Sequence, residues 1–442
     1  MSLLPSQPAG KLWAGALAVV LFLVLASVAW IERDAYRFAA AILVVWGSVL
    51  YFRADFRPSI GWMGLICIAW VAFVAIRYAI LYFDPAVLSH GTSEGIYLLP
   101  IFYMTVGYMM YRYRETLGAT VVLFILISFV MAAATLPLSS LFDEGQHPFL
   151  VMKNTIHSSV GAGLIILASI NFAGFAARNF TDARQRWFWE AISYATIAVC
   201  FIGLYGAKSK GVWAAMAVAL CVQLLLAARK THGMRRWLTG AVLLGALALF
   251  VSVFSFGIWS TIGPTYEEAS AIVAKILQTG QPIQTIQQAI ASEDIPASMQ
   301  IRLMLWLNAI DVLSRNVLFG SGIAWKDYWL QAHYSDTGFD LLHNGYLEIA
   351  VRYGLLGLAF YTILYAWTVR TAYKAFQRGL IPIEAFNAHI VLLVFFLVTI
   401  ASNSNNRLAI GESYMMLAGA FGFFCHYLCQ RAAVPAGKLE PA

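Results

Sequence analysis

Charged residues are scarce in this chain of 442 residues: Asp, Glu, Lys and Arg make up 12% of it, whereas a soluble domain typically has about a quarter. Hydrophobic residues reach 61%, against about half in a soluble domain. This balance excludes an ordinary soluble domain and is typical of a membrane protein. The net charge of +7 is not evidence of nucleic-acid binding, because basic residues also orient membrane proteins.

Cysteine is rare too, and none of the cysteines is placed to form a disulfide bond outside the membrane. All of them lie in apolar runs, at Cys67, Cys200, Cys221, Cys425 and Cys429. Cys425, His426 and Cys429 share a helical face, but such a group at the end of an apolar run more often faces lipid or packing than a metal. No Asp-x-Asp motif stands in a predicted outer loop, so we expect neither a bound metal nor another cofactor.

Apolar runs of about 17 to 25 residues recur along the chain, and each is long enough to cross a bilayer. Because a segment in lipid must satisfy its own backbone groups, these runs predict helices. The fold class is therefore an all-α polytopic membrane protein with about twelve transmembrane helices. We place them at Leu12–Ile31, Tyr36–Phe52, Ile60–Phe83, Ile96–Tyr111, Leu117–Leu138, Ser159–Ala177, Phe188–Gly206, Val212–Ala228, Trp237–Trp259, Tyr346–Trp367, Ala388–Ser402 and Leu408–Tyr427.

Charge is distributed unevenly between the two sides of the predicted helices. The segments on the side of the two termini carry most of the lysines and arginines, and the segments on the other side carry most of the acidic residues. By the positive-inside rule, we expect both termini to be cytoplasmic.

The chain reads as one membrane domain over residues 1–442, with one long outer segment, 260–342, between the ninth and tenth predicted spans. Helical periodicity predicts helices at Ile262–Gly280, Gln281–Ile295 and Ala297–Leu313. An irregular, lid-like loop is expected at Ala324–Asp340. A long segment of this kind is the first place to look for function.

Five basic residues on the outer side or within the membrane need an explanation, namely Arg77, Lys153, Lys208, Lys210 and Arg302. Two of them occupy the short turn Gly206-Ala-Lys-Ser-Lys-Gly211, and Arg77 lies in an otherwise uncharged run, where an arginine is costly. Each one alone could be an anchor to lipid head groups. Together they predict a binding site for an anion such as a diphosphate, whose charge grows as a bond to it breaks.

His343 stands where the outer segment ends and the tenth span begins, in the run Asp340-Leu-Leu-His343-Asn344-Gly345-Tyr346-Leu-Glu348. The ordinary pKa of histidine suits proton transfer near neutral pH, so His343 is our candidate general base. It could instead simply begin the helix. Other outer histidines lack comparable surroundings; they are His147, His157 and His333.

Trp306 follows Arg302 by four residues, so the two share one face of a predicted helix. An aromatic ring at this place fits the face of a sugar or a lipid chain equally well.

Four of these elements, in this order, resemble the O-antigen ligase and polymerase superfamily over about the last half of the chain. They are Gly206-Ala-Lys-Ser-Lys-Gly211, Arg302-Leu-Met-Leu-Trp306, Phe319-Gly-Ser-Gly322 and the run from His343-Asn-x-x-Leu-Glu to Gly354-Leu-Leu-Gly357. They are similar to the family's Ser-Arg-Gly turn, Arg-x-x-x-Trp helix, Gly-x-Gly and His-Asn-x-x-Leu motif. Lys210 stands where the family has arginine, which keeps the charge and loses the bidentate fork.

The resemblance implies a glycosyltransferase-C-like enzyme of the bacterial inner membrane whose active site faces the periplasm. An O-antigen ligase transfers a glycan from undecaprenyl diphosphate to a sugar hydroxyl of lipid A–core, and we expect this chain to do so without a metal. His343 and Arg302 would be catalytic. The residues expected to bind substrate are Lys208, Lys210, Lys153, Arg77, Asn344 and Trp306.

Other readings share this pattern. A repeat-unit polymerase and a protein O-oligosaccharyltransferase differ from a ligase only in the acceptor, which one sequence does not identify. A polysaccharide transporter or flippase is the alternative without an enzymatic activity, and it predicts internal duplication and broken helices that are not clear in this sequence. Membrane lipids are expected partners in every case, and nucleic acids in none.

Overall fold

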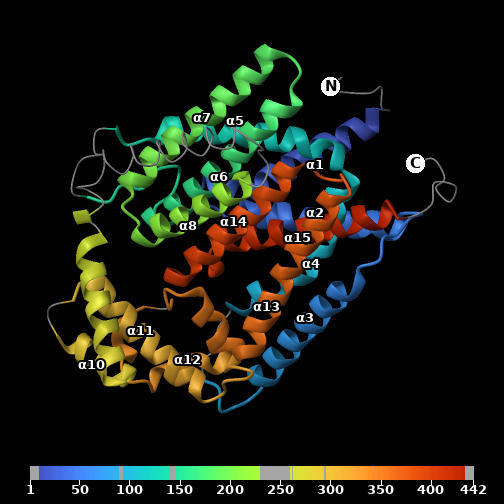
Figure 1. Cartoon of the computed structure of the whole chain (residues 1–442). Helices are drawn as coiled ribbons and strands as arrows, with labels where there is room; N and C mark the ends of the chain where they lie inside the picture. Colours follow the sequence, from blue (N-terminus) through green and yellow to red (C-terminus); the bar gives the residue numbers. More distant parts are fainter. Residues whose placement is uncertain are drawn as a thin grey trace.

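The computed structural model describes residues 9–88, 93–138, 145–228, 259–260, 262–292, 295–339 and 341–433. These residues form a bundle of helices, and a smaller group of helices lies at one side of the bundle (Figure 1). Within the described ranges there is no β-strand, only an isolated bridge between Ile31 and Val151. The all-α prediction is confirmed.

The described residues contain nine helices that are long and apolar enough to cross a membrane, which confirms a polytopic membrane protein. The bundle helices are α1 (Ala9–Ala26), α2 (Ala35–Arg53), α3 (Gly61–Tyr82), α4 (Pro100–Arg112), α5 (Leu117–Thr135), α6 (Thr155–Asn179), α7 (Ala183–Gly206), α8 (Lys210–Ala228), α13 (Gly345–Gln377), α14 (Ile383–Ser402) and α15 (Ala409–Arg431).

Three predicted spans are not among the nine. The helix α4 has 13 residues, so it rises about 20 Å and is too short for a hydrocarbon core of roughly 30 Å. The helix α15 has 23 residues and packs against both α4 and α13. These neighbours shield it from lipid, so it can hold polar residues such as Ser413 and His426. The predicted span Trp237–Trp259 falls, apart from its last residue, outside the described residues.

The bundle closes into a ring of packed helices. Contacts run from α1 to α2, α4, α15, α13, α14, α6, α7 and α5, and α5 returns to α1. Gly107 brings α4 close to α15, because a Cβ at this position would lie 2.6 Å from the carbonyl oxygen of Ala420. Small residues at such crossings are typical of packed membrane helices.

The helix α13 is broken at Gly354, whose φ of 62° is in the left-handed region. A Cβ there would lie 2.4 Å from the carbonyl of Leu318, so only glycine fits. At the break, the N–H groups of Leu355 and Leu356 donate to the carbonyls of Val317 and Leu318 at 2.9 and 3.1 Å. These bonds hold the loop after α11 against α13.

The 260–342 segment is largely helical, as predicted. Residues 262–279 form a helix, followed by α10 (Pro282–Ala291), α11 (Ala297–Ser314) and α12 (Trp325–Leu330). Figure 1 shows α10, α11 and α12 together at one side of the bundle.

The prediction of an irregular loop at 324–340 is wrong in its first part. Trp325 and Trp329 are one helical turn apart, and both are buried in a cluster that includes Leu305 and Val312 of α11. Burying two large rings on the same side stabilises the short helix α12. The short 3₁₀ turns η5 (Gly322–Ala324) and η6 (Ser335–Thr337) flank it.

Candidate functional site

His343 lies in the loop that joins the 260–342 segment to α13. Its φ is 50°, a conformation that residues other than glycine rarely adopt. Its imidazole makes an edge contact with the ring of Phe339, with 5.6 Å between the centroids. A strained residue persists only where its surroundings hold it firmly, and such strain is found most often at functional sites.

Leu342, the residue before His343, is held at both of its backbone groups. Its N–H donates to Oε1 of Glu348 at 2.8 Å, and its carbonyl accepts from Nε1 of Trp306 at 3.2 Å. Trp306, which we expected to bind substrate, therefore fixes the loop that presents His343.

Asn344 caps α13. Its side-chain oxygen accepts from the N–H groups of Tyr346 and Leu347 at 3.0 and 3.2 Å. A cap of this kind is the commonest role of asparagine at a helix start. Its contacts place His343 one residue outside a well-defined helix end, and substrate binding by Asn344 stays a prediction.

Glu348 is the centre of a buried ionic network beneath the loop. Its side chain is fully buried and lies 2.6 Å from Nη1 of Arg352 and 2.9 Å from Nη1 of Arg407. Ser404 also donates to it, at 2.9 Å. A buried carboxylate requires such partners, and through its bond to Leu342 the network is connected to the loop of His343.

Arg352 extends this network to the other side of α13. Its guanidinium is fully buried, lies 4.4 Å over the ring of Trp325, and has its Nε 3.5 Å from a carboxylate oxygen of Glu94. Tyr353 donates to the same carboxylate. Glu94, Arg352 and Arg407 were not among the predicted site residues. The spacing of Glu348 and Arg352 by four residues was the one signal in the sequence that could have indicated a pair.

Arg302 projects from α11 and is partly buried. No hydrogen bond or ion pair joins its guanidinium to another described residue, whereas the guanidinium of Arg352 is paired with Glu348. Burial lowers the pKa of Arg302 below its usual value. A partly buried guanidinium without an anion beside it is suited to receive one from a ligand.

The electrostatic surroundings of His343 favour the neutral form of its imidazole. Burial lowers its pKa below the ordinary value, the charge of Arg302 lowers it further, and the carboxylate of Glu348 acts in the opposite direction. The positive charge of Arg302 also interacts with the positive charge of Lys210. The structure thus brings together His343, Arg302 and Lys210 from three distant parts of the sequence.

The turn before α8 places its two lysines differently. Lys210 is the first residue of α8, and its ammonium group donates to Thr265 at 2.7 Å, which joins α8 to the helical residues 262–279. Lys208 has a φ of 49°, another left-handed conformation in a residue other than glycine. The hydrogen bond of Lys210 thus limits the movement of its side chain.

Arg77 binds the protein itself. Its two terminal nitrogens donate to the carbonyls of Phe319 and Gly320, and its guanidinium lies 6.0 Å from the ring centre of Phe73. It fastens the loop after α11 to α3. These contacts explain an arginine inside an apolar run, and its predicted contact with substrate stays a prediction.

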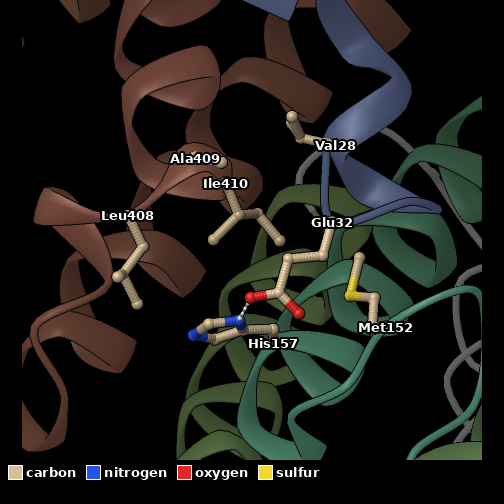
Figure 2. A pocket seen from close by; sticks show the side chains of 7 residues that line it. All are labelled: Val28, Glu32, Met152, His157, Leu408, Ala409 and Ile410. Carbon is tan, nitrogen blue, oxygen red and sulfur yellow. Dashed lines mark hydrogen bonds and ion pairs between the residues drawn. The ribbon is translucent and has the colours of Figure 1, made fainter. Parts of the chain in front are cut away.

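Lys153 lies on the surface, apart from the other predicted residues. Its backbone N–H donates to Glu32 at 3.1 Å, and the same carboxylate lies 3.0 Å from Nδ1 of His157. Figure 2 shows this pair beside Leu408 at a cavity of about 50 Å³. That volume is far below the roughly 300 to 1,000 Å³ of ligand pockets, so the cavity is too small for a glycan.

Among the described residues, no three His, Cys, Asp or Glu side chains gather in a way that could hold a metal ion. The cluster at His343 is instead cationic, and its carboxylate Glu348 is consumed by two arginines.

Residues 195–362 match a family described as O-antigen ligase. The matched region contains His343, Arg302, Lys208, Lys210, Asn344 and Trp306, whereas Arg77 and Lys153 precede it. No curated protein matches the chain.

Proposed function

Because the chain carries a domain of the O-antigen ligase family, we propose that it is an O-antigen ligase which transfers a glycan from undecaprenyl diphosphate to a sugar hydroxyl of lipid A–core. Enzymes of this superfamily are glycosyltransferase-like proteins of the membrane. The observation that carries the proposal for this chain is the interaction of His343, whose pKa is lowered, with the positive charge of Arg302, a guanidinium that makes no hydrogen bond or ion pair within the described part of the chain.

The proposed reaction uses His343 as the base. The acceptor hydroxyl attacks the anomeric carbon of the donor sugar, and its proton passes to the imidazole. The new bond joins the acceptor oxygen to the anomeric carbon, while the bond from that carbon to the diphosphate oxygen breaks with its electron pair. A positioned base of this kind contributes about 10²–10⁴-fold in rate.

The cations are proposed to stabilise the leaving diphosphate. The negative charge of the diphosphate increases as the bond breaks. Guanidinium and ammonium groups that the fold already holds in position therefore bind the transition state more tightly than they bind the intact donor. Arg302 offers a planar set of donors, Lys210 adds positive charge near it, and Lys208 lies in the same turn as Lys210. Because these positive charges would offset the charge of the leaving group, the proposed step requires no divalent metal.

The proposed orientation follows from the lysines and arginines. With both termini in the cytoplasm, the 260–342 segment and His343 lie at the periplasmic face of the inner membrane. A donor anchored by an undecaprenyl chain would present its diphosphate at this face, near the turn that carries Lys208 and Lys210.

The acceptor is tested directly with purified protein in lipid nanodiscs, supplied with an undecaprenyl-diphosphate-linked glycan. One reaction receives lipid A–core and a second receives only further lipid-linked glycan. A glycan joined to lipid A–core supports the ligase. A lengthened lipid-linked glycan in the second reaction, without product in the first, would replace it by a polymerase, and no transfer in either would contradict both.

A further inference from the structure

A cavity lined by basic residues lies at the end of the bundle opposite His343. The helix α13 begins beside His343, and its last turns, with the first turn of α3 and the end of α15, surround a cavity of about 320 Å³. Its lining includes Trp62, Trp367, Arg370, Lys374, Arg378 and His426. This volume is within the range of small-molecule sites.

Three cations line this cavity, and no acidic residue of the described ranges lines it. Arg370, Lys374 and Arg378 follow one another at intervals of four, so they share one face of α13. Like charges at this spacing repel each other, which destabilises the free helix. An anion in the cavity would remove that repulsion.

Two of the three cations form no hydrogen bond or ion pair with the described residues. Arg378 donates from Nη1 to the carbonyl of Cys429 at 3.0 Å. Arg370 and Lys374, by contrast, make no hydrogen bond or ion pair with another residue of the described ranges. Their positive charge is therefore available to a ligand.

The polar wall opposite is fixed in place. Gln430 donates to the carbonyl of Ser59 at 2.7 Å and accepts from the N–H of Ser59 at 2.8 Å. His426 lies 2.6 Å from the same amide. These bonds join the end of α15 to the start of α3, so that the cavity is preformed and little ordering is needed when a ligand binds.

The other wall is apolar, and one of its residues is exposed at the outside of the bundle. Trp367 is buried, whereas Trp62 is 54% exposed at the first turn of α3. Tryptophan at the end of a membrane helix is typical of the lipid interface. A ligand with a phosphate and an acyl chain matches a cavity with cations on one side and an exposed indole on the other.

We propose that this cavity binds the phosphate head group of an anionic phospholipid in the leaflet opposite the His343 site. Basic pockets between helices are known to hold such head groups. A basic residue that only orients the protein in the membrane does not need to line a cavity. Arg184 and Arg186 illustrate this, because they lie at the start of α7 at the same end of the bundle and line neither cavity.

The test uses the full-length protein in detergent and measures bound lipid by native mass spectrometry. The probes are phosphatidylglycerol, phosphatidylcholine and inorganic phosphate. We expect phosphatidylglycerol to bind the wild type more tightly than phosphatidylcholine does. The double variant Arg370→Gln/Lys374→Gln should bind phosphatidylglycerol roughly 30-fold more weakly, since each basic residue contributes about a fivefold factor.

The matched control is Arg184→Gln/Arg186→Gln, which removes the same charge at the same end of the bundle and should keep wild-type affinity. If the first double variant does not fold, Arg370→Lys/Lys374→Arg retains both charges and should bind as the wild type does, and each single Gln variant should lose about fivefold.

Equal binding of the two lipids, or an equal loss in the control, would overturn the proposal. Displacement of phosphatidylglycerol by inorganic phosphate would support recognition of the phosphate group. Binding of inorganic phosphate without binding of phosphatidylglycerol would overturn the lipid as the occupant.

Discussion

Trp306 and Leu342 are joined by a hydrogen bond of 3.2 Å from the indole N–H to the backbone carbonyl. Trp306 stands one helical turn beyond Arg302 on α11, and Leu342 directly precedes His343. One helix face thus carries the proposed anion-binding guanidinium and also holds the loop of the proposed base. This hydrogen bond therefore limits how far the loop of His343 can move from the helix that carries Arg302.

We expect Trp306→Phe to lower kcat about tenfold, because it removes this hydrogen bond and keeps most of the ring, and loss of positioning of this size is typical for a group that aligns reactants. The KM for the donor should change little. Steady-state assays of glycan transfer would measure both constants. Trp329→Phe is the control, since its ring is buried beside the same helix and should leave kcat within a few-fold. A change in KM alone for Trp306→Phe would indicate substrate binding instead.

Glu348→Ala should destabilise the protein by about 3–5 kcal/mol, because it leaves the fully buried Arg352 without its closest anion. The exposed Glu267 provides a control, for which replacement by Ala should change stability by less than about 0.5 kcal/mol. Thermal unfolding of the two purified variants would measure the difference. Equal melting temperatures would show that the network does not stabilise the loop.

The sequence could predict the helices and the position of His343 but not the partners of the charges. Apolar runs located the bundle because spanning segments must be long and apolar. Glu94 and Arg352 are 258 positions apart in the sequence, and only the folded bundle brings them together. The sequence indicated that Arg77 is costly inside an apolar run. It could not indicate that the carbonyls of Phe319 and Gly320 accept hydrogen bonds from its guanidinium.

Excess EDTA should leave glycan transfer unchanged, because the proposed diphosphate site consists of protein cations and Glu348 is already bound by arginines. The measurement is turnover by purified protein before and after chelation, with magnesium and manganese added back. Loss of turnover on chelation and its recovery with either metal would show that cations of the protein do not suffice.

Arg302→Ala should reduce the rate of transfer on the order of 10²-fold or more, as the loss of a donor to a developing anion does. Lys210→Arg should be tolerated, because it keeps the positive charge and restores the arginine of the family. Lys275→Gln removes an exposed charge from the same segment and serves as the control. Full activity of a folded Arg302→Ala protein would place the diphosphate site elsewhere.

The pH profile tests whether Arg302 acts on His343. The imidazole is a base only when neutral, and burial together with the Arg302 charge lowers its pKa from the ordinary value. The rate should therefore hold through neutral pH and fall only as the pH drops through this lowered pKa. In Arg302→Gln the pKa rises, so the fall should begin at a higher pH. The profile of Lys275→Gln should match that of the wild type.

His343→Ala should lower glycan transfer by about 10²–10⁴-fold, the contribution of a general base, and should leave insertion and donor binding intact. His333→Ala is the matched control, because His333 lies in the same segment and its ring contacts Tyr334, so its loss should cost little. Transfer rates are compared at equal membrane abundance. His343 occupies a strained backbone position, but its side chain makes none of the hydrogen bonds that hold this loop. Those bonds are made by Leu342 and Asn344, so the Ala variant should keep them. A rate within a few-fold of wild type would mean that His343 only leads into α13, and that the acceptor loses its proton to another group.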